Sequence, residues 1–501
     1  MNFKVINNTI GRLLQVLAVL MVFPLIVAFI YKESLNDKLY FLFPIILSAL
    51  LGSLLVRRGS EKGHIFTREA MFTTALCWVL YSIIGAIPLY LTPTNFPTFL
   101  DAFFEMASGF TTSGASVATD IDILPHSILF WRSFSHLIGG MGILVFTLAI
   151  LPKQNKESSN LMQAEVPGPT FGKITPKLAE TARVLYILYL SLTIITMIAL
   201  LLAGMSLFDS IIFAMGAAGT GGFANHGTSV SFYDSRTIEI ILGIAMMLFG
   251  VNFNLYYYAI FKSVKESFKS EELWIYIGVI FVASILIFIS IIPIYNDPLY
   301  SGSNAFFTVS SIITTTGYVS ADFGNWPFFA RHLLTLLMFI GGCAGSTAGG
   351  LKVSRVVMMF KSGLNQVKTA INPKRITVNR LDGKKVDEDV EIATNRYFLI
   401  YTILFVVFMI IVSIDTNNFE TAFTAVAATI NNIGPYIGEL GPMDTFARMS
   451  DLSKFVLTFA MLFGRLELYP MLLLLSPLTY KNIKKKWNQN IKFILQKTLI
   501  F

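Results

Sequence analysis

Four short stretches of this sequence decide its fold: Thr111-Thr112-Ser113-Gly114-Ala115, Gly219-Thr220-Gly221-Gly222-Phe223, Thr314-Thr315-Thr316-Gly317-Tyr318 and Asn431-Asn432-Ile433-Gly434-Pro435. Each stretch follows a short, moderately apolar segment, at 98–110, 206–218, 303–313 and 418–430. Segments of about 11 to 13 residues are too short to cross a membrane, but they suit re-entrant half-helices. The stretches recur about every 95 to 117 residues, which predicts four diverged repeats of span, half-helix, glycine turn and span.

The composition around these stretches is typical of a membrane protein. Of 501 residues, 54% are hydrophobic and only 14% are charged, whereas an ordinary globular chain carries about 25% charged residues. The first apolar run continues to Tyr31 without a small-residue cleavage pattern, so we interpret it as a span and not as a signal peptide. Ten spans are expected, at about 11–31, 40–56, 71–92, 130–151, 183–204, 237–260, 273–294, 332–360, 397–414 and 453–479.

The formal charge of +8 is distributed unevenly along the chain. Lysines and arginines gather in alternate loops, at 57–68, 153–177, 262–269, 361–396 and in the tail from 481. The intervening stretches contain neither Lys nor Arg, at 92–127, 205–235, 296–330 and 416–447. By the positive-inside rule these stretches face outward and both termini face the cytoplasm. A nucleic-acid surface would instead need its basic residues on one folded domain, beside stacking aromatic side chains.

Four glycine turns around one axis would form a path for a cation. A cation that crosses hydrocarbon must exchange its water shell for oxygens, which a ring of backbone carbonyls can supply. Glycine permits the positive φ and the close approach that such a ring requires, and the half-helices add their negative ends. One such turn could merely cap a helix or pack closely, but four in register favour a filter. The predicted filter residues are Thr111, Thr112, Ser113, Gly114, Gly219, Thr220, Gly221, Gly222, Thr314, Thr315, Thr316, Gly317, Asn431, Asn432, Ile433 and Gly434.

Charged residues flank these turns on the outward side. The acidic ones would concentrate cations above the ring. They are Asp101, Glu105, Asp120, Asp122, Asp209, Asp234, Asp297, Asp322, Glu420, Glu439 and Asp444. Four arginines each mark the start of the span after a turn, and we interpret them as interfacial anchors that snorkel to the membrane surface. They are Arg132, Arg236, Arg331 and Arg448.

A glycine-rich segment interrupts the expected span at 332–360. It contains Gly341, Gly342, Gly345, Gly349 and Gly350. Non-helical backbone at membrane depth is tolerated where it is buried in protein or lines a wet cavity, so we expect a loop that crosses the pore. The alternative is a helix-packing face of small residues.

Arg465 is a second gate candidate, because it falls in the middle of the last expected span. There an Arg costs at least about 2.5 to 3.5 kcal/mol unless it faces water or a partner, so it should point into the pore. It would oppose cation passage or donate hydrogen bonds to carbonyls of the glycine-rich segment. The alternative is a salt bridge with Glu467 elsewhere in the bundle.

Four further stretches carry a resemblance to a known family: Trp131 to Ile143 (WRSFSHLIGGMGI), Ala164 to Ala182 (AEVPGPTFGKITPKLAETA), Gly341 to Lys352 (GGCAGSTAGGLK) and Gly464 to Leu468 (GRLEL). With the turns and the two extra N-terminal spans, they resemble the TrkH branch of the TrkH, KtrB and HKT superfamily of K⁺ transporters over nearly the whole chain. The resemblance implies that Gly114, Gly222, Gly317 and Gly434 are filter glycines. In HKT relatives a Ser in the first place goes with Na⁺ selectivity, so four glycines favour K⁺.

The same resemblance implies further properties. The glycine-rich segment would act as an intramembrane gate, with Arg465 holding it shut. The protein would be a homodimer on a cytoplasmic nucleotide-binding ring of the TrkA type. The basic loop 361–396 and the tail would contact that ring, although attraction to anionic membrane lipid explains them equally well. The second turn, Gly219 to Gly222, departs most from a Thr-rich filter.

The sequence thus predicts an all-α polytopic membrane protein, with two N-terminal transmembrane helices and four K⁺-channel-like repeats of helix, pore helix and helix around one central pore. The expected division is 1–70 for the N-terminal helices, 71–152 for the first repeat, 153–270 for the second repeat with its preceding cytoplasmic loop, 271–393 for the third repeat with the gate and a cytoplasmic loop, and 394–501 for the fourth repeat and basic tail.

The predicted function is channel-like K⁺ uptake across the inner (plasma) membrane, gated from the cytoplasm. The alternative is a secondary symporter of K⁺ with H⁺ or Na⁺, which normally needs buried Asp, Glu or His relays, and few of these lie in span centres. An enzyme is not indicated, because the sequence contains no H-E-x-x-H motif or phosphate loop, and Cys77 and Cys343 lack the spacing of a metal or disulfide site. K⁺ is the expected transported ion, and no cofactor or nucleic acid is implied.

Overall fold

The computed structural model of the chain describes residues 1–60, 65–92, 95–143, 178–375, 377–438 and 441–480. Within these residues the fold is helical apart from one small hairpin, which confirms the predicted all-α class. The long helices expose large apolar side chains, among them Phe29, Leu202, Phe281, Ile289 and Leu399. Exposed apolar surface of this extent is typical of a face that lipid covers. The end of the expected span 130–151, most of the family-like stretch 164–182 and the basic tail lie outside the described residues.

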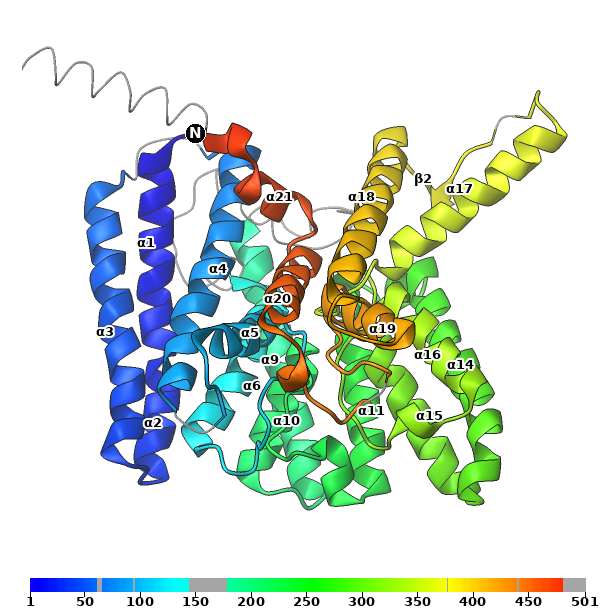
Figure 1. Ribbon diagram of the computed structural model, residues 1–501. Coiled ribbons are helices and arrows are strands. Elements are labelled where there is room, and N and C mark those ends of the chain that lie inside the picture. The colour runs from blue at the N-terminus through cyan, green and yellow to red at the C-terminus, as the bar shows by residue number, and fades with distance from the viewer. Residues whose placement is uncertain (61–64, 93–94, 144–177, 376, 439–440, 481–501) are drawn as a thin grey trace, which may run out of the picture.

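The N-terminal helices form a separate layer at one side of the molecule, drawn in blue in Figure 1. Helix α1 (Phe3–Leu20) continues into α2 (Val22–Ile30), and α3 (Leu35–Arg58) packs against α1. A Cβ atom at Gly11 would lie 2.6 Å from the carbonyl oxygen of Gly52, so the two backbones approach too closely for any other residue. The Tyr81 hydroxyl joins this layer to the bundle by donating to the Leu13 carbonyl, at 2.6 Å.

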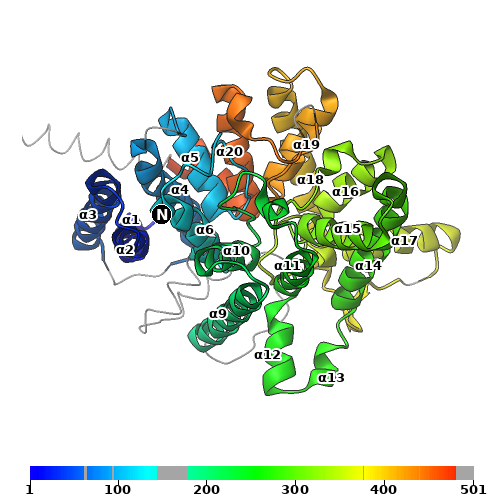
Figure 2. The same cartoon turned by 90° about the horizontal axis from the view of Figure 1, so that it is seen from below.

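Four units of long helix, short helix and second helix make up the rest of the bundle. The long helices are α4 (Thr67–Leu91), α9 (Leu178–Leu202), α14 (Glu271–Tyr295) and α18 (Glu388–Val412). The short ones are α5 (Phe99–Phe110), α10 (Leu207–Gly219), α15 (Pro298–Ile313) and α19 (Phe419–Ile430). The second helices are α6 (His126–Gly140), α11 (Arg236–Phe249), α16 (Phe328–Ile340) and α20 (Asp451–Arg465). Seen from below, the short and second helices surround a common centre (Figure 2).

The short helices begin where their sequences place a capping side chain. Thr98, Ser206, Asp297 and Asn418 each accept a hydrogen bond from a backbone N–H of the first turn. Such a cap satisfies a donor that has no partner within the helix, typically for about 1 kcal/mol. Three of these helices begin within a residue of the predicted half-helices, and α15 begins five residues earlier than 303, at Pro298.

The second helices are shorter than predicted, and two expected continuous spans are wrong. Helix α11 ends at Phe249, and α12 (Phe253–Phe261) turns away by 88°. Helix α20 ends at Arg465, and the next helix, α21 (Tyr469–Leu475), begins only after Glu467 and Leu468 adopt positive φ. The cause is a local change in backbone direction, and the apolar composition of a segment does not reveal such a change. Six described helices are long and apolar enough to cross a membrane, or seven if α11 and α12 count as one span.

The remaining elements are short or project from the bundle. Helix α17 (Val353–Ile371) follows the glycine-rich segment and extends outward in Figure 1, and the chain then returns to the hairpin of β1 (Arg380–Leu381) and β2 (Lys384–Lys385), which lies beside α18. The strands are antiparallel, with Arg380 opposite Lys385. The rest are α13 (Val264–Ser267) and the 3₁₀ turns η1 (Ser229–Tyr233), η2 (Phe323–Asn325) and η3 (Phe446–Arg448). The N-terminus, α21 and the far end of α17 lie at the same end of the molecule in Figure 1.

Candidate ion pathway

The four short helices end in the same turn. In each turn, a residue one or two positions after the end of the helix adopts a left-handed φ. These residues are Thr112 (55°), Thr220 (54°), Thr315 (57°) and Asn432 (56°). The next N–H groups, of Ser113, Gly221, Thr316 and Ile433, each donate to the carbonyl five residues earlier, at 2.7–2.9 Å. This is the Schellman pattern, which reverses the chain at a helix C-terminus and normally uses glycine at the left-handed position. The second turn, the most divergent in sequence, has the same backbone as the other three.

The glycine that ends each turn lies against the next turn. A Cβ atom at Gly114 would lie 2.0 Å from the Gly221 oxygen, and one at Gly222 would lie 2.1 Å from the Thr316 oxygen. A Cβ atom at Gly317 would lie 1.9 Å from the Ile433 oxygen, and one at Gly434 would lie 2.6 Å from the Ser113 oxygen. The contacts run from the first turn to the second, third and fourth and back to the first, so the turns form a closed ring. The four glycines also have φ of 75–99°, a region that other residues rarely adopt.

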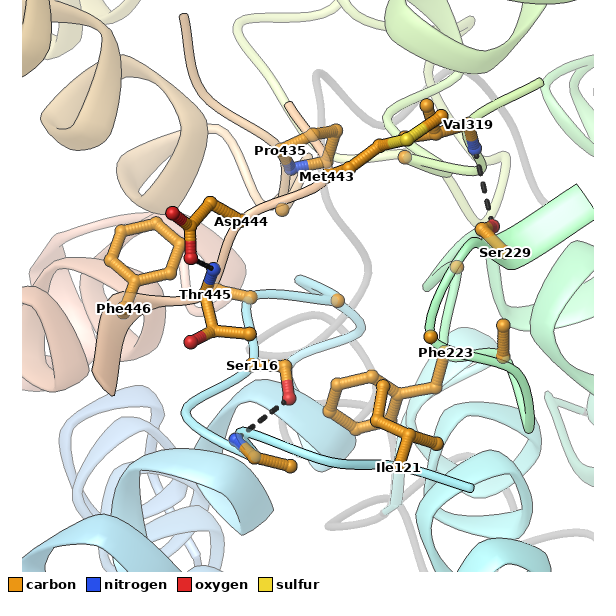
Figure 3. A pocket seen from close by; sticks show the side chains of 18 of the residues that line it. Ser116, Ile121, Phe223, Ser229, Val319, Pro435, Met443, Asp444, Thr445 and Phe446 are labelled. Carbon is orange, nitrogen blue, oxygen red and sulfur yellow. Dashed lines mark hydrogen bonds between the residues drawn. The ribbon is translucent and has the colours of Figure 1, made fainter. Parts of the chain in front are cut away.

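A cavity of about 340 Å³ lies directly beside this ring, on the side of the loops that follow the turns. All four ring glycines line it, together with Asp120, Asp122 and Asp444. Figure 3 shows Phe223, Val319 and Pro435, which follow their glycines, around this opening with Asp444 at its edge. Water and a hydrated cation can therefore reach the carbonyls of the ring from this side.

Several acidic residues expected above the ring are paired instead. The Asp101 carboxylate lies 2.7 Å from Lys454 Nζ and the Glu105 carboxylate 2.7 Å from Arg132 Nη2, and all four side chains are buried. Nearer the surface, Asp297 pairs with Arg236 at 2.6 Å and Glu420 with Arg331 at 3.3 Å. The sequence could not reveal these partners, since Asp101 and Lys454 are 353 residues apart. The negative charge of the cavity wall therefore comes from fewer carboxylates than predicted.

Arg132 is not the interfacial anchor that its position predicts. Its side chain is only 1% exposed, its Nε donates to Glu105 at 2.8 Å, and its Nη1 donates to the Ala224 carbonyl at 3.2 Å. The guanidinium also lies over the Phe223 ring, 4.1 Å from its centre. Arg132 thus joins the chain after the second turn to the short helix of the first unit. Arg236 and Arg331 are partly exposed, as expected of anchors, and Arg448 lines the cavity.

The glycine-rich segment lies against the other side of the ring. The Gly349 N–H donates to Thr315 Oγ1 at 2.6 Å, and a Cβ atom at Gly349 would lie 2.3 Å from the Asn431 oxygen. The segment is not helical between α16 and α17, and Gly341, Gly345 and Gly350 have φ of 71–76°. Its glycines therefore serve a folded loop between two helices, not a helix-packing face.

Two buried cationic side chains donate hydrogen bonds to backbone carbonyls of this loop. Arg465 donates from Nη1 to the Thr347 carbonyl at 2.8 Å and from Nη2 to the carbonyls of Gly139 and Gly140. The Lys352 ammonium, only 1% exposed, donates to the Ala348 carbonyl. Arg465 thus ends a helix instead of lying in mid-span, although it is buried among carbonyls as an inward Arg should be. Glu467, the alternative partner, makes two hydrogen bonds with Arg355.

Lys352 was not among the predicted gate residues. The available signal was a lysine within an expected span, at 332–360, which carries the same desolvation cost that singled out Arg465. The break between α11 and α12 was missed as well, and it also contacts the loop. The Gly250 carbonyl accepts from Cys343 at 2.9 Å, and the Phe253 N–H donates to the Gly345 carbonyl at 3.1 Å.

The chain forms an apolar helical bundle with a closed ring of backbone carbonyls. A cavity lies on one side of this ring, and a loop held by the cationic side chains of Lys352 and Arg465 lies on the other. These features define the class of membrane proteins that move ions. Within this class the chain is a member of the TrkH family, because residues 38–482 match the family described as TrkH, cation transport protein. This confirms the family to which the sequence motifs pointed. It is a family of transporters and not of enzymes.

Proteins of known name and known structure support this membership. The chain is 35% identical to the Trk system potassium uptake protein TrkH of Escherichia coli K12, over 95% of this chain and 99% of that protein. The crystal structure of the potassium transporter TrkH from Vibrio parahaemolyticus matches with a TM-score of 0.86 and 32% identity, over 96% of this chain and 100% of that one. An uncharacterized cation transporter of Methanocaldococcus jannaschii is 30% identical, with 96% of both chains covered.

Proposed function

We propose that this protein takes up K⁺ across the inner membrane through the ring of four turns. The observation that carries the proposal is the closed order of the ring, in which every glycine lies against a carbonyl of the next turn. The relatives in E. coli and V. parahaemolyticus are named as potassium transporters, which supports K⁺ as the ion. A dehydrated cation would be coordinated by carbonyls of the sixteen predicted filter residues, four from each turn.

The glycine-rich loop would act as the gate of this pathway. It lies across the inner side of the ring, where Gly349 contacts both the third and the fourth turn. Arg465 and Lys352 place two positive charges on its carbonyls, and these charges would repel K⁺ electrostatically. The structure would then represent a closed state, and moving residues 341–352 away from the ring would open the path.

Assembly and orientation follow from the basic elements. We propose that both termini are cytoplasmic, and that α17 and its hairpin project into the cytoplasm with Lys361, Lys368, Lys384 and Lys385. A homodimer with a cytoplasmic nucleotide-binding ring of the TrkA type would use this basic region, which extends outward from the bundle in Figure 1. The division of the chain into an N-terminal pair and four pore repeats belongs to the same proposal.

Coupled symport with H⁺ or Na⁺ is the second candidate function. One observation favours it: Glu239 on α11 is only 5% exposed, and its Oε2 has no hydrogen-bond partner among the residues that the structure describes. A buried carboxyl group with an unused oxygen is typical of a proton or cation relay. The other buried carboxylates in the part of the chain that the structure describes, Asp101, Glu105, Glu69 and Glu272, have cationic or backbone partners.

Radiotracer flux into proteoliposomes tests the proposal. K⁺ and Rb⁺ should compete for tracer uptake and Na⁺ should compete poorly, and Na⁺ passing as readily as K⁺ would contradict the selectivity. Uptake driven by a pH gradient alone would favour the symporter, and the Glu239→Gln variant should then abolish that coupling. Arg465→Ala should raise the K⁺ leak, and an unchanged flux in this variant would rule out the proposed gate.

A further inference from the structure

Glu272 holds the two ends of the glycine-rich loop with a single oxygen. Its side chain comes from the first turn of α14 and is only 6% exposed. Its Oε1 accepts one hydrogen bond from the Ala344 N–H, at 2.7 Å, and another from the Ser354 N–H, at 3.0 Å. Ala344 lies near the start of the loop, and Ser354 lies just after its end.

The two bonds bring together the two ends of the loop, residues 342–344 and 353–354, which we call its neck. The Val353 N–H also donates to the Gly342 carbonyl, at 3.0 Å, so the backbone on both sides of the neck is already in contact. The residues between them carry the Thr347 and Ala348 carbonyls that bind Arg465 and Lys352. The positions of those carbonyls therefore depend on a neck that α14 holds from outside.

Glu272 also supplies a cap that α17 does not supply for itself. The N-cap residue of α17, Lys352, makes no side-chain capping bond, and it has a φ of 78°. The first N–H groups of a helix need acceptors, and a negative charge near them is favourable because of the helix dipole. A carboxylate from another helix meets both needs, which accounts for the burial of this charge at the junction of α14 and α17.

We propose that Glu272 is a positioning residue for the gate, which clamps the neck of the loop so that its carbonyls stay over the inner side of the ring. The inference rests on the proposed role of the loop as a gate. Opening the loop would break the Ala344 bond, while the Ser354 bond can persist as the cap of α17. Glu272 then acts as the fixed point about which the loop moves.

Tracer flux in proteoliposomes measures the effect on the closed state. Glu272→Ala removes both bonds and should raise the basal K⁺ flux roughly tenfold or more, given the usual strength of hydrogen bonds to a charged group. Glu272→Gln keeps an acceptor oxygen and should raise it less. The matched control is Glu271→Ala, since Glu271 is the preceding residue of the same turn but pairs with Lys361 at the surface. Its flux should equal that of the unmodified protein.

A thiol measurement reports the neck itself. Cys343 immediately precedes Ala344 and is fully buried. In a background where Cys77 is replaced by Ala, N-ethylmaleimide should label Cys343 faster in Glu272→Ala than in the unmodified protein. A loss of global stability would not give this pattern without a parallel drop in the melting temperature, which is measured on the same samples.

The outcomes separate the clamp from the gate. If Arg465→Ala raises flux while both Glu272 variants leave flux and labelling unchanged, the clamp is wrong and the gate stands. If neither Arg465→Ala nor the Glu272 variants change flux, the gate itself is wrong. An equal effect of Glu271→Ala would also overturn the clamp. If Glu272→Ala does not fold, Glu272→Gln decides, and its effect should not add to that of Arg465→Ala because both act on one loop.

Discussion

The ring of turns and the layer next to it toward the glycine-rich loop are built by the same four units but differ in symmetry. We call this layer the inner layer, and it comprises the ends of α6 and α20, the break between α11 and α12, and residues 341–352. In the ring, all four turns share one backbone conformation and one hydrogen-bond pattern. In the inner layer, α6 ends at Gly140, α11 bends into α12, residues 341–352 form a loop, and α20 ends at Arg465. Symmetry is therefore retained where the proposed filter needs equal oxygens around one ion, and it is lost where the proposed gate needs only one element to block the path.

The two layers also differ in what stabilises them. The ring places Thr112, Thr220, Thr315 and Asn432 in left-handed conformations, each of which costs on the order of 1 to 3 kcal/mol and persists only when its surroundings impose it. The inner layer depends on charged side chains that bond to backbone groups, above all Arg465, which joins the fourth unit to the first and third, and Lys352 and Glu272, which hold the loop of the third unit. The ring should therefore be intolerant of any added atom, whereas the inner layer should respond to the removal of charges.

The largest effect is expected at a ring glycine. Gly317→Ala would place a methyl group 1.9 Å from the Ile433 oxygen at a φ of 82°, so the third and fourth turns must separate. K⁺ uptake should be lost. Gly363→Ala is the control, since a Cβ atom at that helical glycine of α17 meets nothing within 4 Å. Tracer uptake of both variants checks this, and normal K⁺ uptake by Gly317→Ala would show that the ring is not a rigid filter.

The next largest effect is expected for the buried pair behind the ring. Arg132→Ala leaves the fully buried Glu105 carboxylate without its cation, which typically costs about 3 to 5 kcal/mol. The melting temperature in detergent should fall strongly, and the double variant Arg132→Met with Glu105→Gln should recover part of the loss. Arg236→Ala breaks an exposed pair and serves as the control. Equal losses for Arg132→Ala and Arg236→Ala would contradict the role of burial.

A moderate effect is expected for Lys352. Lys352→Met keeps the length of the side chain but removes the ammonium group from the Ala348 carbonyl. Losing a charged hydrogen bond of about 1.5 to 3 kcal/mol should raise basal K⁺ flux roughly tenfold. The competition between K⁺ and Na⁺ should not change, because the ring is intact. A variant with altered selectivity would show that the two layers do not divide the functions as proposed.

The smallest effect is expected far from both layers. Hydrogen bonds from the Tyr300 and Leu299 N–H groups, together with Arg236, lower the pKa of Asp297, which caps α15 at the surface. A lowered pKa contributes stability above the unfolded value, and this contribution is lost as the pH falls through the folded pKa. The melting temperature of Asp297→Asn should be slightly lower than that of the unmodified protein at pH 7, and the difference should shrink toward pH 3. A difference that grows on acidification would contradict this.

The sequence by itself determined the features that depend on neighbouring residues. The length and apolar composition of the segments located the short helices, and the Gly-containing turns located the ring. These features are local because hydrogen bonds within a helix and its terminal turn join residues only a few positions apart, at most six in these turns. The family followed from the same short motifs, and the match over residues 38–482 confirmed it.

Only the tertiary structure decided which distant segments meet. Composition cannot distinguish a continuous apolar helix from one bent by 88°, so the breaks after Phe249 and Arg465 were missed. The partners of Asp101 and Glu467 come from other units, and the partner of Glu105 comes from a different helix of its own unit, so the charges were misread as free or differently paired. A buried charge is stable only with a partner, and that partner is fixed by the packing of the units and not by the order of residues.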